Sequence, residues 1–430
     1  MTATQQARGE ALAPQRVGAA EQDVLVVAGE TSGDLHAARL LSALAERRGG
    51  GDLRFFGLGS HQLRAAGCEC LYDSEEISVV GIVEVLKIYR RARQIFDGLL
   101  AEVDRRGART ALLVDFPEFN MRLARELRRR GVRVLYYISP QIWAWRQGRV
   151  RAIERDVDLM LVLFPFEVDF YREHAVEAEW VGHPLVDEVP EQPQLWDGLE
   201  EADAERAGSG GPDPQDEITV SLLPGSRRSE VRALLPAMLS AVEHLAAAGR
   251  RLRVQLIQAP SIRDDFLDEV MAGSAVLQEP PERVRENRFD AVSRSHIALC
   301  ASGTATLEVA LLRTPMVVLY RLKWMSYWLG RLLVKLPHFC MVNLVLGRRA
   351  VPELLQAETR GERVAEEMGK VLDDPARRAA MRRDLAELRR ALGESGASAR
   401  AAAAVDRHLG PPARSAEGAL AHGGAGEAEA

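Results

Sequence analysis

Several features are scarce or missing in this sequence of 430 residues. It has only four cysteines, with no C-x-x-C pair and no histidine at zinc-ligand spacing, so neither a disulfide framework nor a zinc site is predicted. No uncharged apolar stretch reaches the roughly eighteen residues that a membrane-spanning helix needs. The first twenty residues contain no apolar core of the length found in a signal peptide. We therefore expect a cytoplasmic protein.

An excess of positive charge is also missing. The 56 basic and 62 acidic residues give a formal net charge of −6, which argues against a nucleic-acid-binding protein. The composition, 47% hydrophobic and 27% charged, is that of an ordinary globular protein long enough for two or three domains. Any site for an anionic ligand must therefore be local.

The sequence does contain an alternation of short apolar runs and helical stretches. Residues 23–44 have the pattern of a strand, a Gly/Ser turn and a helix, and the same kind of unit begins again at 218–239. This alternation predicts an α/β protein with two Rossmann-like, doubly wound domains that face a central cleft. The predicted boundaries are a disordered tail over 1–22, domains over 23–190 and 218–408, an acidic Gly/Pro-rich linker or insertion over 191–217, and a second disordered tail over 409–430.

The second predicted domain opens with a candidate anion site. Residues 221–231 read SLLPGSRRSEV, so a strand that ends at Pro224 and Gly225 and restarts as a helix would bring backbone N–H groups and the Arg227 guanidinium to one point. Ser226 belongs to the same loop. An ordinary turn with two solvated arginines is an equally good interpretation of this stretch alone.

A second candidate lies in CASGTATLEVA, where a predicted strand gives way to a helix. Ser302, Gly303 and Thr304 offer hydroxyl and backbone N–H groups to a phosphate, and Glu308 could accept hydrogen bonds from the vicinal hydroxyls of a ribose. The alternative is a simple Ser/Thr helix cap with a solvated Glu308. Together with Arg227, the motif favours a nucleotide site.

The first predicted domain offers a candidate general base. Asp115, in LVDFPEFN, comes just after an apolar run, so its carboxylate would lie at the mouth of a parallel sheet. A turn-forming or helix-capping aspartate before Pro117 is the alternative. Glu30 and Ser32, in AGETSGD, occupy the turn after the first predicted strand.

Neither a cofactor nor a metal is predicted. AGETSGD lacks the G-x-G-x-x-G fingerprint, which disfavours a dehydrogenase. The acidic pair Asp156 and Asp158 precedes its strand, so it would lie at the sheet edge opposite the ligands.

The segment 309–352 has no acidic residue and seven basic ones. Inside it, apolar residues at spacings of three and four form one helix face, flanked by basic side chains and accompanied by Trp324, Tyr327 and Trp328. Such helices lie at anionic membrane surfaces or hold amphiphilic phosphates. A core helix at a dimer or domain interface remains the alternative.

Ten motifs in order and spacing give the sequence a family resemblance. They are VAGETSGD, GIVEVL (81–86), VDFPEFN, YYISPQIWAWRQGRV (136–150), FPFE (164–167), VGHPLVDE (181–188), LLPGSRRSEV, ASGTATLE, TPMVVLYRL (314–322) and VPELLQ (351–356). In these motifs the sequence resembles the lipid-A-disaccharide synthases over roughly residues 23 to 400.

The resemblance implies an inverting glycosyltransferase of the two-domain B-type fold that works without a metal ion. The reaction implied is transfer of 2,3-diacylglucosamine from its UDP conjugate to 2,3-diacylglucosamine 1-phosphate, giving a β-1,6 disaccharide and UDP. The family works as a peripheral protein on the cytoplasmic face of the inner membrane, and dimer partners exchange their C-terminal portions. A homodimer that binds no nucleic acid is therefore expected.

The resemblance also implies roles for single residues. The UDP site would consist of Ser226, Arg227, Ser302, Gly303, Thr304 and Glu308; Asp115 would act on the acceptor hydroxyl, and Glu30, Ser32, Glu84 and Asn343 would contact the acyl-sugars. Departures from the family pattern, such as VNLVLGRR around Asn343, concern substrate detail. Two rivals remain at this point: another UDP-N-acetylglucosamine transferase or epimerase of the same fold, and a non-catalytic protein that docks on membranes and binds nucleotide.

Overall fold

The computed structural model describes residues 22–50, 52–78, 85–143, 147–192, 195–196, 198, 217–274, 279–321 and 338–409. The chain divides into two compact units, Met1–Leu135 with Ala402–Ala430, and Tyr136–Ala401. The predicted tails and the predicted linker lie largely outside the described residues, and the predicted domain boundaries remain predictions.

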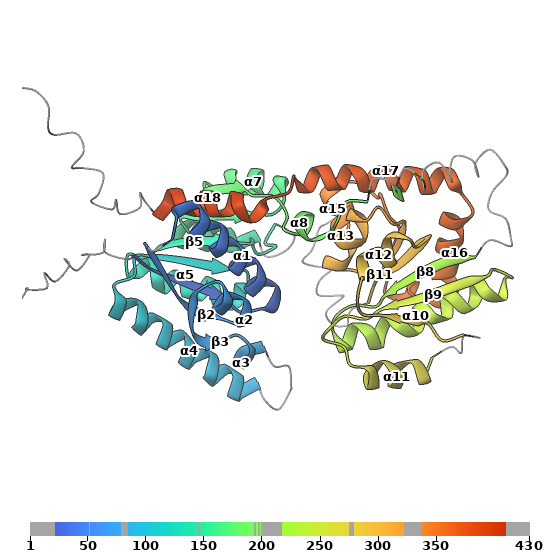
Figure 1. The fold of residues 1–430 in the computed structure, drawn as a ribbon, viewed down its shortest axis with the longest axis horizontal. Coiled ribbons are helices and arrows are strands. Elements are labelled where there is room, and N and C mark those ends of the chain that lie inside the picture. Colours follow the sequence, from blue (N-terminus) through green and yellow to red (C-terminus); the bar gives the residue numbers. More distant parts are fainter. Residues whose placement is uncertain are drawn as a thin grey trace, which may run out of the picture. The chain divides into compact units, whose positions relative to one another are not determined.

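Two parallel β-sheets form the framework of the molecule (Figure 1). The strands of the first sheet, in spatial order, are β3 (Cys68–Asp73), β2 (Leu53–Gly59), β1 (Gln22–Ala28), β4 (Thr110–Val114), β5 (Arg133–Tyr137), β6 (Leu159–Val162) and β7 (Ala178–Trp180). Those of the second are β10 (Glu282–Val284), β9 (Leu252–Ile257), β8 (Ile218–Leu223), β11 (Ile297–Ala301), β12 (Met316–Tyr320) and β13 (Glu353–Leu355).

The strand order fixes where a ligand can bind in each sheet. Strand β1 pairs with both β2 and β4, and β8 pairs with both β9 and β11, in parallel register throughout. The order of the strands therefore reverses between β1 and β4 and between β8 and β11. Ligands of doubly wound sheets bind outside the carboxyl ends of the strands at such switch points.

Helices connect the strands, as the alternating pattern predicts. Their bounds are α1 (Thr31–Arg48), α2 (His61–Ala65), α3 (Glu75–Ser78), α4 (Val85–Arg106), α5 (Pro117–Arg129), α6 (Val150–Asp156), α7 (Pro165–Arg172), α8 (Leu185–Glu188), α10 (Arg228–Ala247), α11 (Asp264–Ala272), α12 (Arg288–Ser293), α13 (Thr304–Leu311), α15 (Met341–Leu346), α16 (Gly361–Leu372), α17 (Pro375–Leu392) and α18 (Ala397–Leu409). Short 3₁₀ turns occupy Gln147–Arg149 and Gln356–Glu358. Figure 1 shows α10 and α11 on one side of the second sheet and α12, α13 and α15 on the other.

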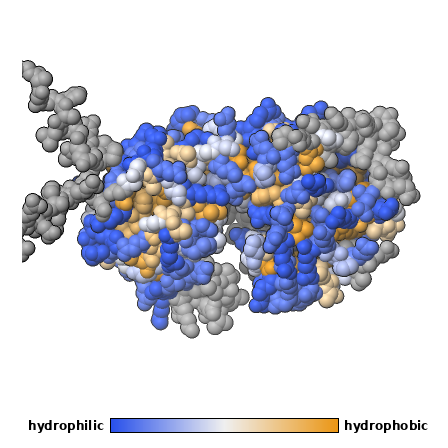
Figure 2. Space-filling model, viewed as in Figure 1, coloured by the Kyte–Doolittle hydropathy of each residue, from blue (hydrophilic) through white to orange (hydrophobic). Residues whose placement is uncertain are grey.

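The central strands are mostly apolar because both faces of each sheet are covered. Every residue of β4 and of β11 is buried, a pattern typical of parallel strands between two helix layers. Hydrophilic residues cover most of the face drawn in Figure 2, with hydrophobic residues showing between them. A helix long and apolar enough to cross a membrane is absent from the described part of the chain.

Candidate active site

Asp115 lies at the carboxyl end of β4, beside the switch point of the first sheet. It and the next residue, Phe116, both adopt left-handed backbone conformations, with φ of 47° and 50°. Such conformations in residues other than glycine cost about 1–3 kcal/mol each and cluster at functional sites. Helix α5 begins directly afterwards at Pro117, whose ring is pre-formed for a first helical position.

The surroundings of Asp115 adapt its carboxyl group to proton transfer. Burial, together with the nearby Glu30 carboxylate, raises the pKa of Asp115 to about 6, although the backbone N–H of Phe116 opposes the rise. A base with a pKa just below neutral pH is ionised under working conditions and still basic enough to accept a proton. The structure thus brings Asp115 and Glu30 together, while Ser32 is exposed on the first turn of α1.

The predicted anion loop connects β8 to α10. Gly225 has a φ of 107°, and a Cβ atom there would overlap the Glu230 carboxylate, so only glycine fits. Arg227 is the N-cap residue of α10, and its side chain is 76% exposed. Its Nη1 donates to Glu230 Oε1 at 3.0 Å. The loop therefore presents an accessible guanidinium beside free N–H groups at a helix start.

The second predicted anion loop connects β11 to α13. Gly303 is the N-cap residue of α13, and both it and Thr304 are exposed, whereas Ser302 is half-buried. Burial raises the pKa of Glu308, which follows on the same helix, and the Arg288 guanidinium 3.5 Å away lowers it. The carboxylate of Glu308 is accordingly paired on one side and mostly shielded from water.

Tyr320, at the end of β12, joins this site without having been predicted. Burial raises the pKa of its hydroxyl, with a further contribution from the Glu230 carboxylate, and Arg227 opposes the rise. Three consecutive strand ends of the second sheet, those of β8, β11 and β12, thus contribute polar groups. The sequence does not predict this role, because Tyr320 ends an apolar run and the charged groups near it, Glu230 and Arg227, lie about ninety residues away in the chain.

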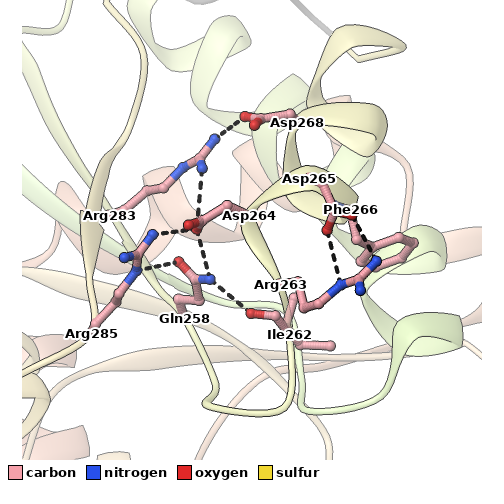
Figure 3. Close-up of polar contacts among 9 residues, drawn as sticks. All are labelled: Gln258, Ile262, Arg263, Asp264, Asp265, Phe266, Asp268, Arg283 and Arg285. Carbon is pink, nitrogen blue, oxygen red and sulfur yellow. Dashed lines mark hydrogen bonds and ion pairs between the residues drawn. The ribbon is translucent and has the colours of Figure 1, made fainter.

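A polar network lies next to the β8–α10 loop, and Figure 3 shows the part of it around Gln258 and Asp264. Ser261 donates its hydroxyl to the carbonyl of Ser226 at 2.7 Å. The segment around Ser261 is held by Gln258, whose amide donates to the carbonyl of Ile262 at 2.7 Å and to Asp264 at 3.0 Å. Arg283 and Arg285 also contact Asp264, and Arg283 contacts Asp268 as well.

Helix α11 also contacts the loop through an aromatic ring. The Arg228 guanidinium lies 4.4 Å from the centroid of the buried Phe266 ring, and that of Arg232 lies 5.1 Å away. Cation–π contacts of this kind orient an arginine. Arg228 is thus oriented by Phe266, whereas the Arg227 side chain pairs with Glu230 and is 76% exposed. The sequence pair RR gave no means of telling them apart.

Glu84 and Asn343 are the other two residues that were predicted to contact the substrates. Glu84 lies outside the described residues, as does most of the amphipathic segment, 322–337. Asn343 is fully buried; its amide donates to the carbonyl of Val351 and to Glu353 and accepts from the backbone N–H groups of Ala350 and Val351, and its contact with an acyl-sugar stays a prediction. Within the structure it shapes the turn before β13.

The FPFE motif contains a buried carboxylate, Glu167, for which the sequence alone predicts no role. Glu167 accepts hydrogen bonds from the Trp143 indole at 3.0 Å and from the backbone N–H groups of Leu163 and Phe164. Burial raises its pKa to about 7. Glu167 thereby ties the loop after β5 to the start of α7. The four-residue motif alone gives no hint of the distant tryptophan.

Among the described residues, no group of three or more His, Cys, Asp or Glu side chains could hold a metal ion. The candidate chemistry consists of a carboxylate at one switch point, and of arginine, backbone N–H groups and a second carboxylate at the other.

Comparisons with known proteins find relatives along most of the chain. Residues 24–407 match the sequence model of the family described as Lipid-A-disaccharide synthetase. The Lipid-A-disaccharide synthase of Myxococcus xanthus (strain DK1622) is 47% identical over 391 residues, which cover 91% of this chain and 98% of that protein.

Two solved structures share the fold at much lower identity. One is a UDP-N-acetylglucosamine 2-epimerase from Listeria monocytogenes, with a TM-score of 0.56 at 11% identity, covering 91% of this chain and 97% of that one. The other is CalG4, the calicheamicin glycosyltransferase, with a TM-score of 0.53 at 15% identity, covering 90% and 98%. The prediction of two Rossmann-like domains of the glycosyltransferase B type is confirmed.

Proposed function

The chain belongs to the lipid-A-disaccharide synthase family and is a glycosyltransferase of lipid A biosynthesis, and from this premise we propose how its residues divide the reaction. The donor is UDP-2,3-diacylglucosamine and the acceptor is 2,3-diacylglucosamine 1-phosphate. The acceptor 6-hydroxyl oxygen forms a bond to the anomeric carbon of the donor with inversion. The bond from that carbon to the diphosphate breaks, and its electron pair leaves with UDP.

Asp115 takes the proton of the attacking hydroxyl. The observation that supports this role is the carboxylate itself: it lies at a switch point, its backbone is strained, and its pKa is raised to about 6 by burial and Glu30. General base catalysis by a positioned carboxylate contributes about 10²–10⁴-fold to a rate. Glu30 and Ser32 lie on the neighbouring turn, where they would contact the acceptor sugar.

The second sheet holds the donor. The diphosphate binds to the Arg227 guanidinium and to the helix starts of α10 and α13, near Ser226, Ser302, Gly303 and Thr304. Negative charge grows on the diphosphate as the sugar leaves, so a guanidinium aimed at it stabilises the transition state without a metal ion. Glu308, which is mostly shielded, accepts hydrogen bonds from the ribose hydroxyls.

The deciding experiment follows radiolabelled 2,3-diacylglucosamine 1-phosphate by thin-layer chromatography in detergent, with the UDP donor and EDTA. Disaccharide is expected from the wild-type protein and from Asp97→Asn, an exposed carboxylate on α4, and not from Asp115→Asn. A folded, UDP-binding wild type that forms no product would refute the proposed reaction. Turnover of a water-soluble acceptor would favour another transferase of the same fold.

We further propose that the protein binds peripherally to the inner membrane. Residues 89–133 contain twelve arginines and six acidic residues, although the whole chain is acidic. Tyr89, on α4, is 61% exposed. Arg122 and Arg125, on α5, are exposed as well. Sedimentation with vesicles at low salt should favour anionic over neutral lipid, and Arg122→Glu with Arg125→Glu should weaken it. Equal binding to both vesicles would contradict the proposal.

A homodimer is the remaining expectation from the family. Asp406, on α18, accepts from Arg47 at 2.7 Å and from Arg48 at 2.6 Å. If partners exchange their C-terminal portions, these pairs form between subunits. Sedimentation velocity should then show a dimer, and Asp406→Arg should shift it toward monomer. A monomeric wild type would refute the exchange.

A further inference from the structure

The connection between β4 and α5 is an elbow of two successive residues, Asp115 and Phe116, in the left-handed region. A bulky aromatic residue is rarely found there. Neither position is a glycine that would adopt this backbone at no cost. Such an elbow persists only where the surrounding structure holds it in place.

Asn120 holds the elbow from inside the protein. Its side chain is fully buried, and its Nδ2 donates to the carbonyl of Asp115 at 2.7 Å and to that of Val114 at 3.2 Å. A third carbonyl, that of Val27, lies 3.5 Å away. The reversed amide would place Oδ1 against these carbonyl oxygens, so only one orientation fits.

The amide oxygen of Asn120 indicates why this side chain is present. Its Oδ1 is buried and has no hydrogen-bond partner among the described residues. An orphaned buried acceptor destabilises the fold, so it is tolerated only where the rest of the group is needed. The group that is needed is the amide NH₂ on the elbow carbonyls.

The Phe116 ring holds the elbow from the other side. A Cβ atom added to Gly29 would overlap this ring, so the ring lies directly on the Gly29 backbone. The ring also stacks on Phe119, with centroids 5.4 Å apart, and Phe119 contacts Phe96 edge-on at 5.6 Å. Gly29 is the residue before Glu30, so the contact links the two loops that carry the carboxylates.

We propose that Asn120, Gly29 and Phe116 are positioning residues that hold the Asp115 carboxylate in its reactive orientation through the left-handed elbow. This inference rests on the proposed role of Asp115 as the base. Residues from two distant motifs, VAGETSGD and VDFPEFN, would thus act together to fix one carboxylate at the sheet edge.

The first test is a double-mutant cycle between Gly29 and Phe116. Gly29→Ala should lower kcat about 10²-fold with the donor KM unchanged, because the displaced ring moves the elbow. Phe116→Ala should lower it about tenfold. The double variant should be no slower than Phe116→Ala, because no ring remains to collide. Gly33→Ala is the matched control: its added Cβ makes only ordinary contacts at 3.7–3.9 Å, so activity should not change.

The second test removes the amide. Asn120→Ala should lower kcat about 10²-fold, leave UDP affinity unchanged, and shift the acidic limb of the pH–rate profile. If Asn120→Ala does not fold, the Gly29 and Phe116 cycle alone decides.

The outcomes distinguish a wrong assignment of the base from a wrong assignment of the positioning residues. Full activity in Asp115→Asn would refute the base itself. An inactive Asp115→Asn beside a fully active Gly29→Ala, or additive losses in the double variant, would overturn the positioning role and leave the base intact.

Discussion

The elbow after β4 and the anion loop after β8 both lie beside the switch point of a parallel sheet, yet they are built differently. The elbow uses an aspartate and a phenylalanine at positive φ, held by buried neighbours, and its carboxylate is partly desolvated. The anion loop takes positive φ at a glycine, Gly225, and leaves Arg227 76% exposed.

The difference matches the two tasks. A base must keep one orientation and a raised pKa before the substrate arrives, so desolvation and strain are useful there. A guanidinium that binds a diphosphate is best left solvated and accessible until the ligand supplies the opposite charge. We therefore expect substitutions in the elbow to act on the chemical step, and those in the anion loop to act on donor binding as well.

The largest expected effect tests the first half of this contrast. Asp115→Asn should lower kcat by about 10²–10⁴-fold, the range for loss of a general base, with UDP affinity unchanged. Single-turnover assays with pre-bound donor, beside UDP titration by calorimetry, measure both quantities. Weakened UDP binding would mean that Asp115 belongs to the donor site instead.

Arg227→Ala should follow, with a loss of about 10²–10³-fold in kcat/KM for the donor. Unlike the first variant, it should also weaken UDP binding, because the guanidinium contacts the diphosphate before and during the reaction. Arg250→Ala, just beyond the C-terminal end of α10 and paired with the exposed Asp373, is the control and should leave donor binding unchanged. If Arg227→Ala lowers kcat and leaves UDP binding unchanged, the expected difference between the anion loop and the elbow is wrong.

The pH dependence of the reaction should report the elbow alone. Because the pKa of Asp115 is about 6 and its ionised form is the base, kcat/KM should be level above pH 7 and fall about tenfold per unit below pH 6. Arg227→Ala should keep that acidic limb, since an arginine does not titrate there. An acidic limb with its midpoint near pH 4 would show that Asp115 is not desolvated in the working enzyme.

Sequence reasoning succeeded where local pattern and chemistry coincide. The alternation of strands and helices predicts both sheets, and the strand–Gly–Ser/Arg patterns predict both strand-to-helix loops, because these elements are specified by nearby residues. That the two loops bind a diphosphate stays a prediction. Sequence reasoning also placed Asp115 at a sheet edge. The role of Gly29 stayed hidden because its contact with Phe116 joins segments about ninety residues apart, and that of Asn120 because it depends on the left-handed backbone of Asp115 and Phe116, which no residue type there predicts.

Residues that look alike in sequence can also differ in structure. Arg227 and Arg228 are adjacent, yet only Arg228 lies against Phe266. Asn120 and Asn343 both follow aromatic or apolar motifs and both are fully buried. The first leaves one oxygen unpaired at the elbow, and the second uses its amide on four protein groups. Only the tertiary hydrogen bonds distinguish them.

A smaller effect concerns stability. The pKa of Asp115 is raised in the folded state above its ordinary value of 3.8, so its ionisation opposes folding: stability is highest below pH 3.8 and declines as the pH rises through 6. Asp115→Asn should therefore raise the free energy of unfolding by about 3 kcal/mol at pH 8 and leave it nearly unchanged at pH 3.5. Arg227→Ala should leave it unchanged at both, since exposed ion pairs contribute little. Urea unfolding at the two pH values measures this difference, and a destabilised Asp115→Asn would contradict the picture of a desolvated base.

The smallest effect tests whether the anion loop needs outside support at all. Ser261 holds the Ser226 carbonyl with one hydrogen bond, and the network around Gln258 and Asp264 fixes the segment that carries it (Figure 3). A single hydrogen bond of this kind contributes about 0.5–1.5 kcal/mol net. Ser261→Ala should therefore raise the donor KM roughly twofold to tenfold with kcat nearly unchanged.

Ser274→Ala provides the matched control for that substitution. Its hydroxyl also donates to a backbone carbonyl, that of Val270 at 2.6 Å, but at the opposite end of α11 from the loop. It should leave the donor KM unchanged. If the two serine variants behave alike, the anion loop is self-supporting. Its glycine and helix start then suffice to present Arg227, while the elbow of the first sheet alone depends on buried neighbours.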